Sequence, residues 1–257
     1  MKRPGVGSGA AAPVAAIGAD SGAVAALLKD LGPQLRRGES LGESSFGSSL
    51  SSLGEEPTRD AMGLPEVDAL LGGGVPRGRI VEIAGPSSSG RTSLALGWLA
   101  RVTRAGEVAA VVDVADALDP PSAAAAGVVL PRILWVRAPG LREALRATER
   151  LLHTRGFALV LLDLDAPGVA ARDAADRTRS GSWLRLSRAA ASARTSVALL
   201  ANERMAGTFS DLALELRPAG ARFSPAPALL EAIESHAVLV RNRLGPPGSE
   251  SRLVLSA

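Results

Sequence analysis

The sequence has no cysteine and only two histidines among its 257 residues. Without cysteine it has no disulfide, no thiolate zinc site and no cysteine nucleophile, which suits a cytoplasmic protein. The histidines, His153 and His236, lack the spacing of a metal site, and no Ser-His-Asp triad is recognisable. No apolar run reaches the ~18 residues that a membrane-spanning helix needs. We therefore expect neither a cysteine-dependent enzyme nor a membrane protein.

Lysine is also nearly absent, since Lys2 and Lys29 are the only two, and arginine is the usual cation of this chain. Lysine and arginine together number 29 against 26 acidic residues, a net charge of +3. This balance does not by itself argue for nucleic-acid binding, although a local basic patch would. The content of 46% hydrophobic and 21% charged residues is ordinary for a soluble globular protein.

The first 58 residues differ in composition from the rest. Residues 1–20 are rich in glycine, alanine and proline, and residues 38–58 are rich in serine and glycine, so both stretches are predicted to be flexible. Between them, residues 23–31 have the leucine spacing of a short amphipathic helix. This helix either folds back on its own domain or docks on a neighbour, because amphipathicity requires burial without naming the partner. We predict a flexible N-terminal tail over 1–58 and one core domain over 59–257.

The core domain alternates apolar segments with amphipathic ones. Apolar strands are predicted at 79–85, 107–114, 133–139, 158–165 and 197–202, with helices at 92–106, 141–156 and 183–196. This alternation is typical of an α/β fold with a mostly parallel sheet covered by helices on both faces. The late strands at 212–216, 237–244 and 252–257 have no comparable helices between them and predict an antiparallel edge.

The segment GPSSSGRTS, residues 85–93, has the spacing of a phosphate-binding loop, G-x-x-x-x-G-K-[ST]. Its strand, glycine-rich turn and helix N-terminus would aim the N–H groups of residues 88–91 at a phosphate. Thr92 would supply a hydroxyl to Mg²⁺. The alternative is a Gly/Ser loop that only caps a helix, with Ser89 or Thr92 as the cap. The candidate cofactor-binding residues here are Gly85, Pro86, Ser87, Ser88, Ser89, Gly90, Arg91, Thr92 and Ser93.

Arg91 stands where such a loop has lysine. The lysine is a compact charge that reaches the β- and γ-phosphates, whereas arginine is larger and planar, so the exchange is not conservative. Arginine still binds phosphate well. We expect weakened binding or a misplaced γ-phosphate, and a chain so poor in lysine also explains how the exchange arose.

A nucleotide bound with Mg²⁺ also needs a carboxylate at the end of a neighbouring strand. The run LVLLDLD supplies Asp163, with Asp165 two residues further on. We predict that Asp163 and Thr92 bind the metal of an ATP–Mg²⁺ complex. The alternative role of Asp163 is a strand-end residue that caps a turn.

Several segments resemble the bacterial RecA recombinases. The closing segment 235–255 is similar to the last core strands of that fold, and 23–38 to the helix through which RecA protomers join. The resemblance covers roughly residues 23–257 and implies a RecA-like P-loop NTPase core with ATP at the strand ends. Its most specific motifs lie in residues 63–96, VVDVADALDP (111–120), the LLDLD strand and VALLANE (197–203).

At several positions where the resemblance implies a functional residue, this sequence has a different one. Ala115 stands where the family has the glutamate that activates the attacking water, and it has no proton-accepting group. Asp119 matches a contact to the nucleotide base, but Ser122 replaces the stacking tyrosine. Asn202 matches the family's asparagine, whereas Glu203 replaces the glutamine that senses the γ-phosphate and would repel it. With Arg91, these departures imply lost or greatly reduced hydrolysis, and no catalytic residue is assigned.

The regions that contact DNA in the family depart as well. The first loop is represented by residues 165–181, whose arginines are balanced by aspartates, and the second is only RMAGTFS (204–210), too short to thread among bases. From the resemblance we expect a core without the C-terminal domain of RecA. We expect at most weak single-stranded DNA binding. Trp183 is predicted either to pack in the core or to make a stacking or protein contact.

We interpret the chain as a RecA-like nucleotide-binding protein of the DNA damage (SOS) response, impaired in hydrolysis and accessory to translesion synthesis or recombination. It is similar in length and in its missing parts to the shortened RecA-like proteins called ImuA, which act with polymerase partners in damage-induced mutagenesis. Expected partners are RecA or a second copy, through the 23–31 helix, and translesion polymerases. The alternatives are an active recombinase that depends on ATP and single-stranded DNA, and a protein-binding scaffold without nucleotide.

Overall fold

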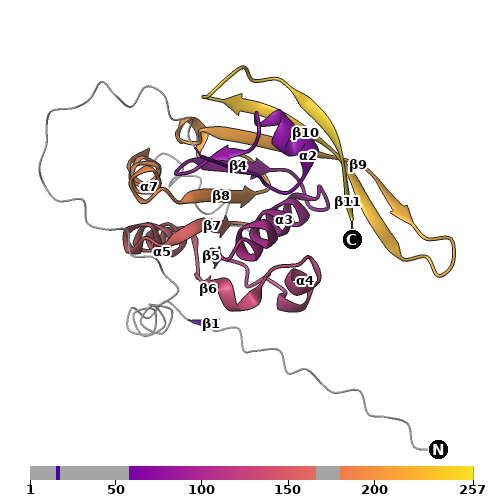
Figure 1. Ribbon diagram of the computed structural model, residues 1–257, viewed down its shortest axis with the longest axis horizontal. Helices are drawn as coiled ribbons and strands as arrows, with labels where there is room; N and C mark the ends of the chain where they lie inside the picture. Colours follow the sequence, from indigo (N-terminus) through magenta and orange to yellow (C-terminus); the bar gives the residue numbers. More distant parts are fainter. Residues whose placement is uncertain (1–15, 18–57, 166–179, 257) are drawn as a thin grey trace, which may run out of the picture.

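The computed structural model describes residues 16–17, 58–165 and 180–256, and within them one large sheet organises the fold (Figure 1). The sheet has nine strands in the order β1-β6-β5-β7-β8-β4-β9-β10-β11. The strands that run from β6 to β9 are parallel, and β10 and β11 add an antiparallel edge. The bounds are β1 Ala16–Ile17, β4 Ile80–Ala84, β5 Val108–Asp113, β6 Ile133–Arg137, β7 Phe157–Asp163, β8 Ser196–Ala201, β9 Leu212–Phe223, β10 Leu230–Asn242 and β11 Glu250–Ser256.

Helices cover both faces of this sheet, as predicted. One face packs against α2 (Pro65–Leu70), α3 (Arg91–Arg104) and α4 (Pro120–Ala125). The other packs against α5 (Leu141–Thr154) and α7 (Ser180–Ala193). Trp183 of α7 is 3% exposed, so of its two predicted roles the core role is confirmed. A two-stranded sheet of β2 (Arg59–Asp60) and β3 (Val75–Pro76) precedes the core, and the short helices η1 (Leu130–Arg132) and η3 (Gly207–Phe209) complete the described elements.

The register of the parallel strands brings four chain segments to one edge of the sheet. Asp113 at the end of β5 is opposite Asp163 at the end of β7, and Asp163 is opposite Leu200 of β8. Ala84 at the end of β4 is opposite Ala201. Because the carboxyl ends of parallel strands meet at one edge, the loops that follow them share one crevice.

The late strands are longer than the sequence predicted. The antiparallel edge is confirmed, but β9 extends to Phe223 and β10 starts at Leu230, so together they form a hairpin that projects beyond the helices (Figure 1). The predicted bounds 212–216 and 237–244 were too short. Residues beyond Leu216 in β9 are exposed on both faces, so they lack the apolar alternation that marks a half-buried strand.

Parts of the predicted N-terminal organisation lie outside the described residues, namely the helix at 23–31 and the linker at 38–57. Ala16 and Ile17 form β1, which pairs in parallel with Trp135 and Val136 of β6. The sequence analysis did not predict this pairing. No helix in the described part of the chain is long and apolar enough to cross a membrane.

Candidate nucleotide-binding site

The loop at residues 85–93 connects β4 to α3, as its sequence predicts. Gly90 is the N-cap of α3 and has a φ of +84°, in the left-handed region that glycine adopts without cost. No side chain caps the helix, so the alternative of Ser89 or Thr92 as the cap is wrong. The chain thus places a glycine and the N-terminus of a helix, the usual means of binding a phosphate, at the strand-end edge.

The main chain of this loop is only partly available for a ligand. The N–H of Ser89 donates to the carbonyl of Pro86 at 3.1 Å and closes a turn, so the prediction that it faces a phosphate is wrong. Within the described residues, the N–H groups of Gly90 and Arg91 have no protein acceptor, as is usual in the first turn of a helix. The Ser89 hydroxyl is buried and lacks a partner among the described groups.

Space limits the residue at positions 85 and 90, and at Gly90 the positive φ is a second requirement. A Cβ on Gly85 would lie 2.6 Å from the carbonyl oxygen of Leu216, and one on Gly90 would lie 2.1 Å from Leu255 Cδ1. The loop is thus packed against β9 and β11. The hydroxyl of Ser235 on β10 also donates to the Ser89 carbonyl at 2.6 Å. These contacts hold the loop rigidly from the antiparallel edge.

Arg91 is the central residue of the site, and it is turned into the protein. Its side chain is 5% exposed. The guanidinium donates to Asn202 Oδ1 at 3.0 Å and makes close contacts with the Gly85 carbonyl and the carboxylate of Asp165. Asn202 Nδ2 in turn donates to Asp165 Oδ1 at 2.6 Å. The guanidinium therefore links the ends of β4, β7 and β8.

Asp165 is a site residue that the sequence analysis noted without giving it a role. The sequence placed the functional carboxylate at Asp163, but the structure gives the contact with Arg91 to Asp165. Asp163 Oδ1 accepts the N–H of Asp165 at 2.9 Å, which also fits the alternative role of a turn cap. Burial raises the pKa of Asp163 from 3.8 to about 6, and the nearby Asp113 and Asp165 act in the same direction.

Asp113 is a second residue that the sequence analysis missed. It is buried at the end of β5 and accepts the N–H groups of Ala115 at 3.0 Å and Leu118 at 2.9 Å. The following segment is thereby fixed with Ala115 half-buried. Asp116 pairs with Arg137 at 2.6 Å on the surface.

Asp119 and Ser122 are joined by hydrogen bonds. The Asp119 carboxylate is the N-cap of α4 and accepts the N–H of Ser122 at 2.9 Å. Hydrogen bonds from Ser122 lower the pKa of Asp119. The structure thus shows that Asp119 caps α4. Its contact with a nucleotide base stays a prediction.

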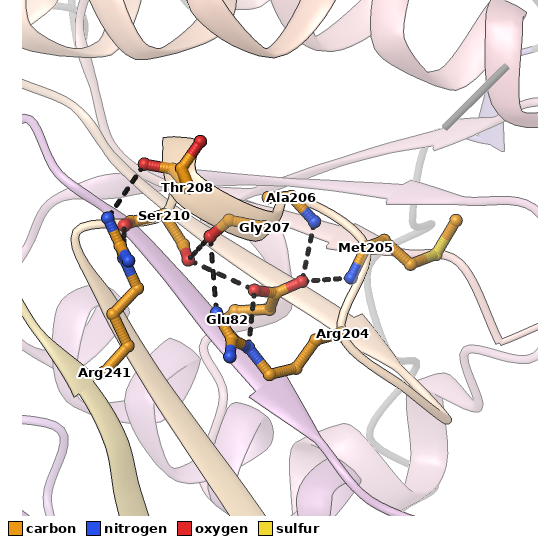
Figure 2. A network of polar contacts seen from close by, with 8 residues as sticks. All are labelled: Glu82, Arg204, Met205, Ala206, Gly207, Thr208, Ser210 and Arg241. Atoms are coloured by element: carbon orange, nitrogen blue, oxygen red, sulfur yellow. Dashed lines mark hydrogen bonds and ion pairs between the residues drawn. The ribbon is translucent and has the colours of Figure 1, made fainter. Parts of the chain in front are cut away.

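A buried glutamate holds the loop that follows Asn202 (Figure 2). Glu82, in the middle of β4, is 0% exposed, accepts the N–H of Ala206 at 2.8 Å and contacts the N–H of Met205. The Ser210 hydroxyl donates to it at 3.2 Å, and Arg204 Nε lies 3.5 Å away. Met205 and Ala206 are buried. A loop fixed in this way does not reach out from the sheet, which supports the prediction drawn from its length.

Two further hydrogen bonds, from a neighbouring strand, hold the loop at residues 204–210. Arg241 of β10 donates to the carbonyls of Ser210 at 2.7 Å and Thr208 at 3.0 Å (Figure 2). Sequence reasoning had assigned no role to Glu82 or Arg241. An acidic residue inside the apolar strand IVEIA was the available signal, since a buried carboxylate requires partners.

The residues present fit the phosphates of a nucleotide in part. The glycine geometry, the free N–H groups of the first helical turn and the unpartnered Ser89 hydroxyl favour an anion at the loop. Thr92 is exposed at the same turn, where its hydroxyl can reach a ligand. The charge that such a loop normally directs at the phosphates is instead bound to Asp165 and Asn202.

A strand, a glycine-rich loop and a helix beside strand-end carboxylates define an α/β protein of the P-loop class. Comparison with known proteins agrees: the family of the RecA N-terminal domain matches residues 42–179. The chain belongs to the RecA family.

The similarity to individual RecA proteins covers only part of each molecule. The chain is 43% identical over 97 residues to Protein RecA of Picosynechococcus sp., covering 38% of this chain and 28% of that protein. It is 42% identical over 129 residues to Protein RecA of Borreliella burgdorferi, covering 47% and 35%. These matches thus span about a third of the relatives' length. The fold is similar to the crystal structure of the RadB recombinase, with a TM-score of 0.58 and 22% identity over 77% of this chain and 96% of that one.

Proposed function

We propose that this protein binds a nucleotide weakly, hydrolyses it slowly or not at all, and serves as an accessory factor in DNA repair. The observation that supports this most directly is the state of Arg91. Its guanidinium is taken up by Asp165, Asn202 and the Gly85 carbonyl. A nucleotide would then be bound through main-chain N–H groups and the hydroxyls of Ser89 and Thr92, without the charge of residue 91, at a site that has ATP and Mg²⁺ as its expected ligands.

The loss of hydrolysis follows from the groups beside the loop. Ala115 has no proton acceptor, and the neighbouring Asp116 is paired with Arg137. A general base must lie within hydrogen-bond reach of the water that it activates. Glu203 places a negative charge next to Asn202, near the position expected for the γ-phosphate. We therefore expect ATP to bind no more tightly than ADP.

The test compares the wild type with variants that restore the family's residues. Binding of fluorescent ADP and ATP and release of phosphate are measured with Mg²⁺, with and without single-stranded DNA. We expect turnover near background for the wild type, and a gain only when Arg91→Lys, Ala115→Glu and Glu203→Gln are combined. Wild-type turnover above about 1 s⁻¹, the low end of ordinary enzymes, stimulated by DNA and abolished by Arg91→Ala, would establish the active recombinase instead.

The scaffold without nucleotide is favoured by the same Arg91 contacts, because Asp165 already pairs with the charge of the guanidinium without a ligand. A thermal shift assay separates the two functions. If millimolar ATP–Mg²⁺ gives no increase in Tm for the wild type or for Arg91→Lys, the scaffold is the better assignment.

The accessory role in mutagenic repair, of the ImuA kind, rests on the resemblance of the sequence. It predicts that purified RecA or a translesion polymerase partner is retained by the immobilised protein. Deletion of residues 1–40, which contain the predicted helix at 23–31, is expected to abolish self-association or RecA binding, as measured by light scattering.

A further inference from the structure

The outer surfaces of α5 and α7 form an open groove on the sheet face that does not carry α3. The residues that line it recur every three or four positions along both helices, so they lie on one side of each helix. The hollow measures about 120 Å³. Its lining includes Arg142, Leu145, Arg146 and Glu149 of α5 and Arg185 and Leu186 of α7.

The floor and the rim of this groove differ in polarity. Leu186 is buried and Leu145 is half-buried, and these leucines form the apolar floor. Arg142, Arg146 and Arg185 are exposed around them. An apolar floor between charged rims is suited to an amphipathic segment, which can bury its apolar side and keep its charged side at the edge.

The two helices carry as much net positive charge as the entire chain. Helices α5 and α7 contain five arginines and two glutamates, a net charge of +3, and the whole chain also has +3. All five arginines are exposed. The rest of the chain is therefore neutral overall, and a negatively charged partner is attracted to this face.

Little of this charge is neutralised within the protein. Arg185 Nε lies 3.1 Å from Glu149 Oε1, across the groove between α7 and α5, and Arg142 lies 3.6 Å from Glu143. Among the described residues, Arg146 has no ion pair, and neither do Arg150 and Arg188. Of the three rim arginines, Arg146 is thus the one without an ion pair among the described residues, and its guanidinium can bind a carboxylate through bidentate hydrogen bonds.

We propose that this groove is the docking site for an acidic amphipathic helix of a partner protein. The leucines of the partner would pack on the half-buried Leu145, and its glutamates or aspartates would pair with Arg146 and the neighbouring arginines. The proposal goes beyond the proposed function and does not require a nucleotide, since the groove lies on the helix surfaces and shares no residue with the 85–93 loop.

A protein segment fits this face better than a nucleic acid does. Single-stranded nucleic acids are bound by basic grooves with exposed aromatic side chains on which bases stack. The only aromatic residue of α5 and α7 is Trp183, and it is 3% exposed. The apolar floor would also make no favourable interaction with the phosphates of a nucleic acid.

The experiment measures binding of a fluorescein-labelled helical peptide of about 18 residues, with leucines at helical spacing and glutamates elsewhere. A peptide of the same composition with shuffled leucines, and an oligothymidylate of similar length, are the comparison probes. The full chain is used without nucleotide, so that a defect in the nucleotide site does not affect the result. We expect binding of the first peptide only, weakened by added salt.

Charge reversal locates the binding surface. Arg146→Glu is expected to raise the Kd of the peptide about tenfold, because it replaces an attraction by a repulsion at the groove. Arg101→Glu makes the same charge change at an exposed position of α3, on the other face of the sheet, and is expected to change the Kd less than twofold. Because both side chains are exposed, thermal melts should match the wild type, and Arg188→Glu repeats the test at an independent position.

The other outcomes overturn the proposal. Absence of peptide binding up to about 1 mM, equal binding of the shuffled peptide, or equal effects of Arg146→Glu and Arg101→Glu each refute a groove for an acidic helix. Binding of the oligothymidylate in place of the peptide, lost in Arg146→Glu, would make this face a nucleic-acid surface.

Discussion

Replacing Glu82 by alanine tests whether a single buried carboxylate positions the loop after Asn202. Glu82 comes from the strand that leads into the phosphate-type loop, and its partners come from residues 204–210 (Figure 2). The variant removes the acceptor for two buried main-chain N–H groups and for the Ser210 hydroxyl. It also leaves Arg204 without the carboxylate that it faces at 3.5 Å.

The expected cost follows from these bonds. A hydrogen bond to a charged group contributes about 1.5–3 kcal/mol, and removing one partner from a buried charged network costs about 3–5 kcal/mol. For a domain of this size 1 kcal/mol corresponds to roughly 2–4 °C in Tm. Glu82→Ala should therefore lower Tm by about 6–20 °C. Glu82→Gln keeps the volume and one acceptor oxygen, and we expect roughly half that loss.

Urea and thermal unfolding followed by circular dichroism measure the effect. The matched control is Glu215→Ala in β9, a half-buried glutamate with one ion pair of 3.5 Å to the exposed Arg217, where a loss below about 1 kcal/mol is expected. Equal losses for the two alanine variants, or a loss below about 1 kcal/mol for Glu82→Ala, would refute the assignment of the loop's order to Glu82.

Two further predictions concern the site. The pKa of Asp163 is raised in the folded state from 3.8 to about 6, so its stabilising effect is complete below pH 3.8 and is lost as pH rises through 6. The unfolding free energy of Asp163→Asn should therefore rise by up to about 3 kcal/mol relative to wild type between pH 4 and 7.5. A difference in unfolding free energy that is constant across this range would contradict the prediction. Gly90→Ala should lower the unfolding free energy by about 2–4 kcal/mol, because residue 90 has a positive φ and a Cβ there would contact Leu255. In urea unfolding, the double variant with Leu255→Ala should lose less stability than the sum of the two single variants. Strict additivity of the two losses would contradict the clash.

The alternation of apolar and amphipathic segments was enough to predict the main strands of the sheet, the long helices α3, α5 and α7 and the placement of the phosphate-type loop, but not the short helices α2 and α4. These features depend on periodicity along the chain, which a sequence shows directly. The full length of β9 was not predictable, because its outer half is exposed and carries no apolar pattern. Glu82 was missed because its partners are set by the fold, up to 128 residues away along the chain.

By itself, the sequence determined that residue 91 is arginine, that residue 115 is alanine and that a glycine stands at position 90, where the helix begins with a positive φ. Only the tertiary structure decided where Arg91 points. A long side chain takes the rotamer that satisfies its donors, and the acceptors of Arg91 include Asp165 and Asn202, which lie 74 and 111 residues away along the chain. They reach Arg91 because parallel strands end at the same edge of the sheet.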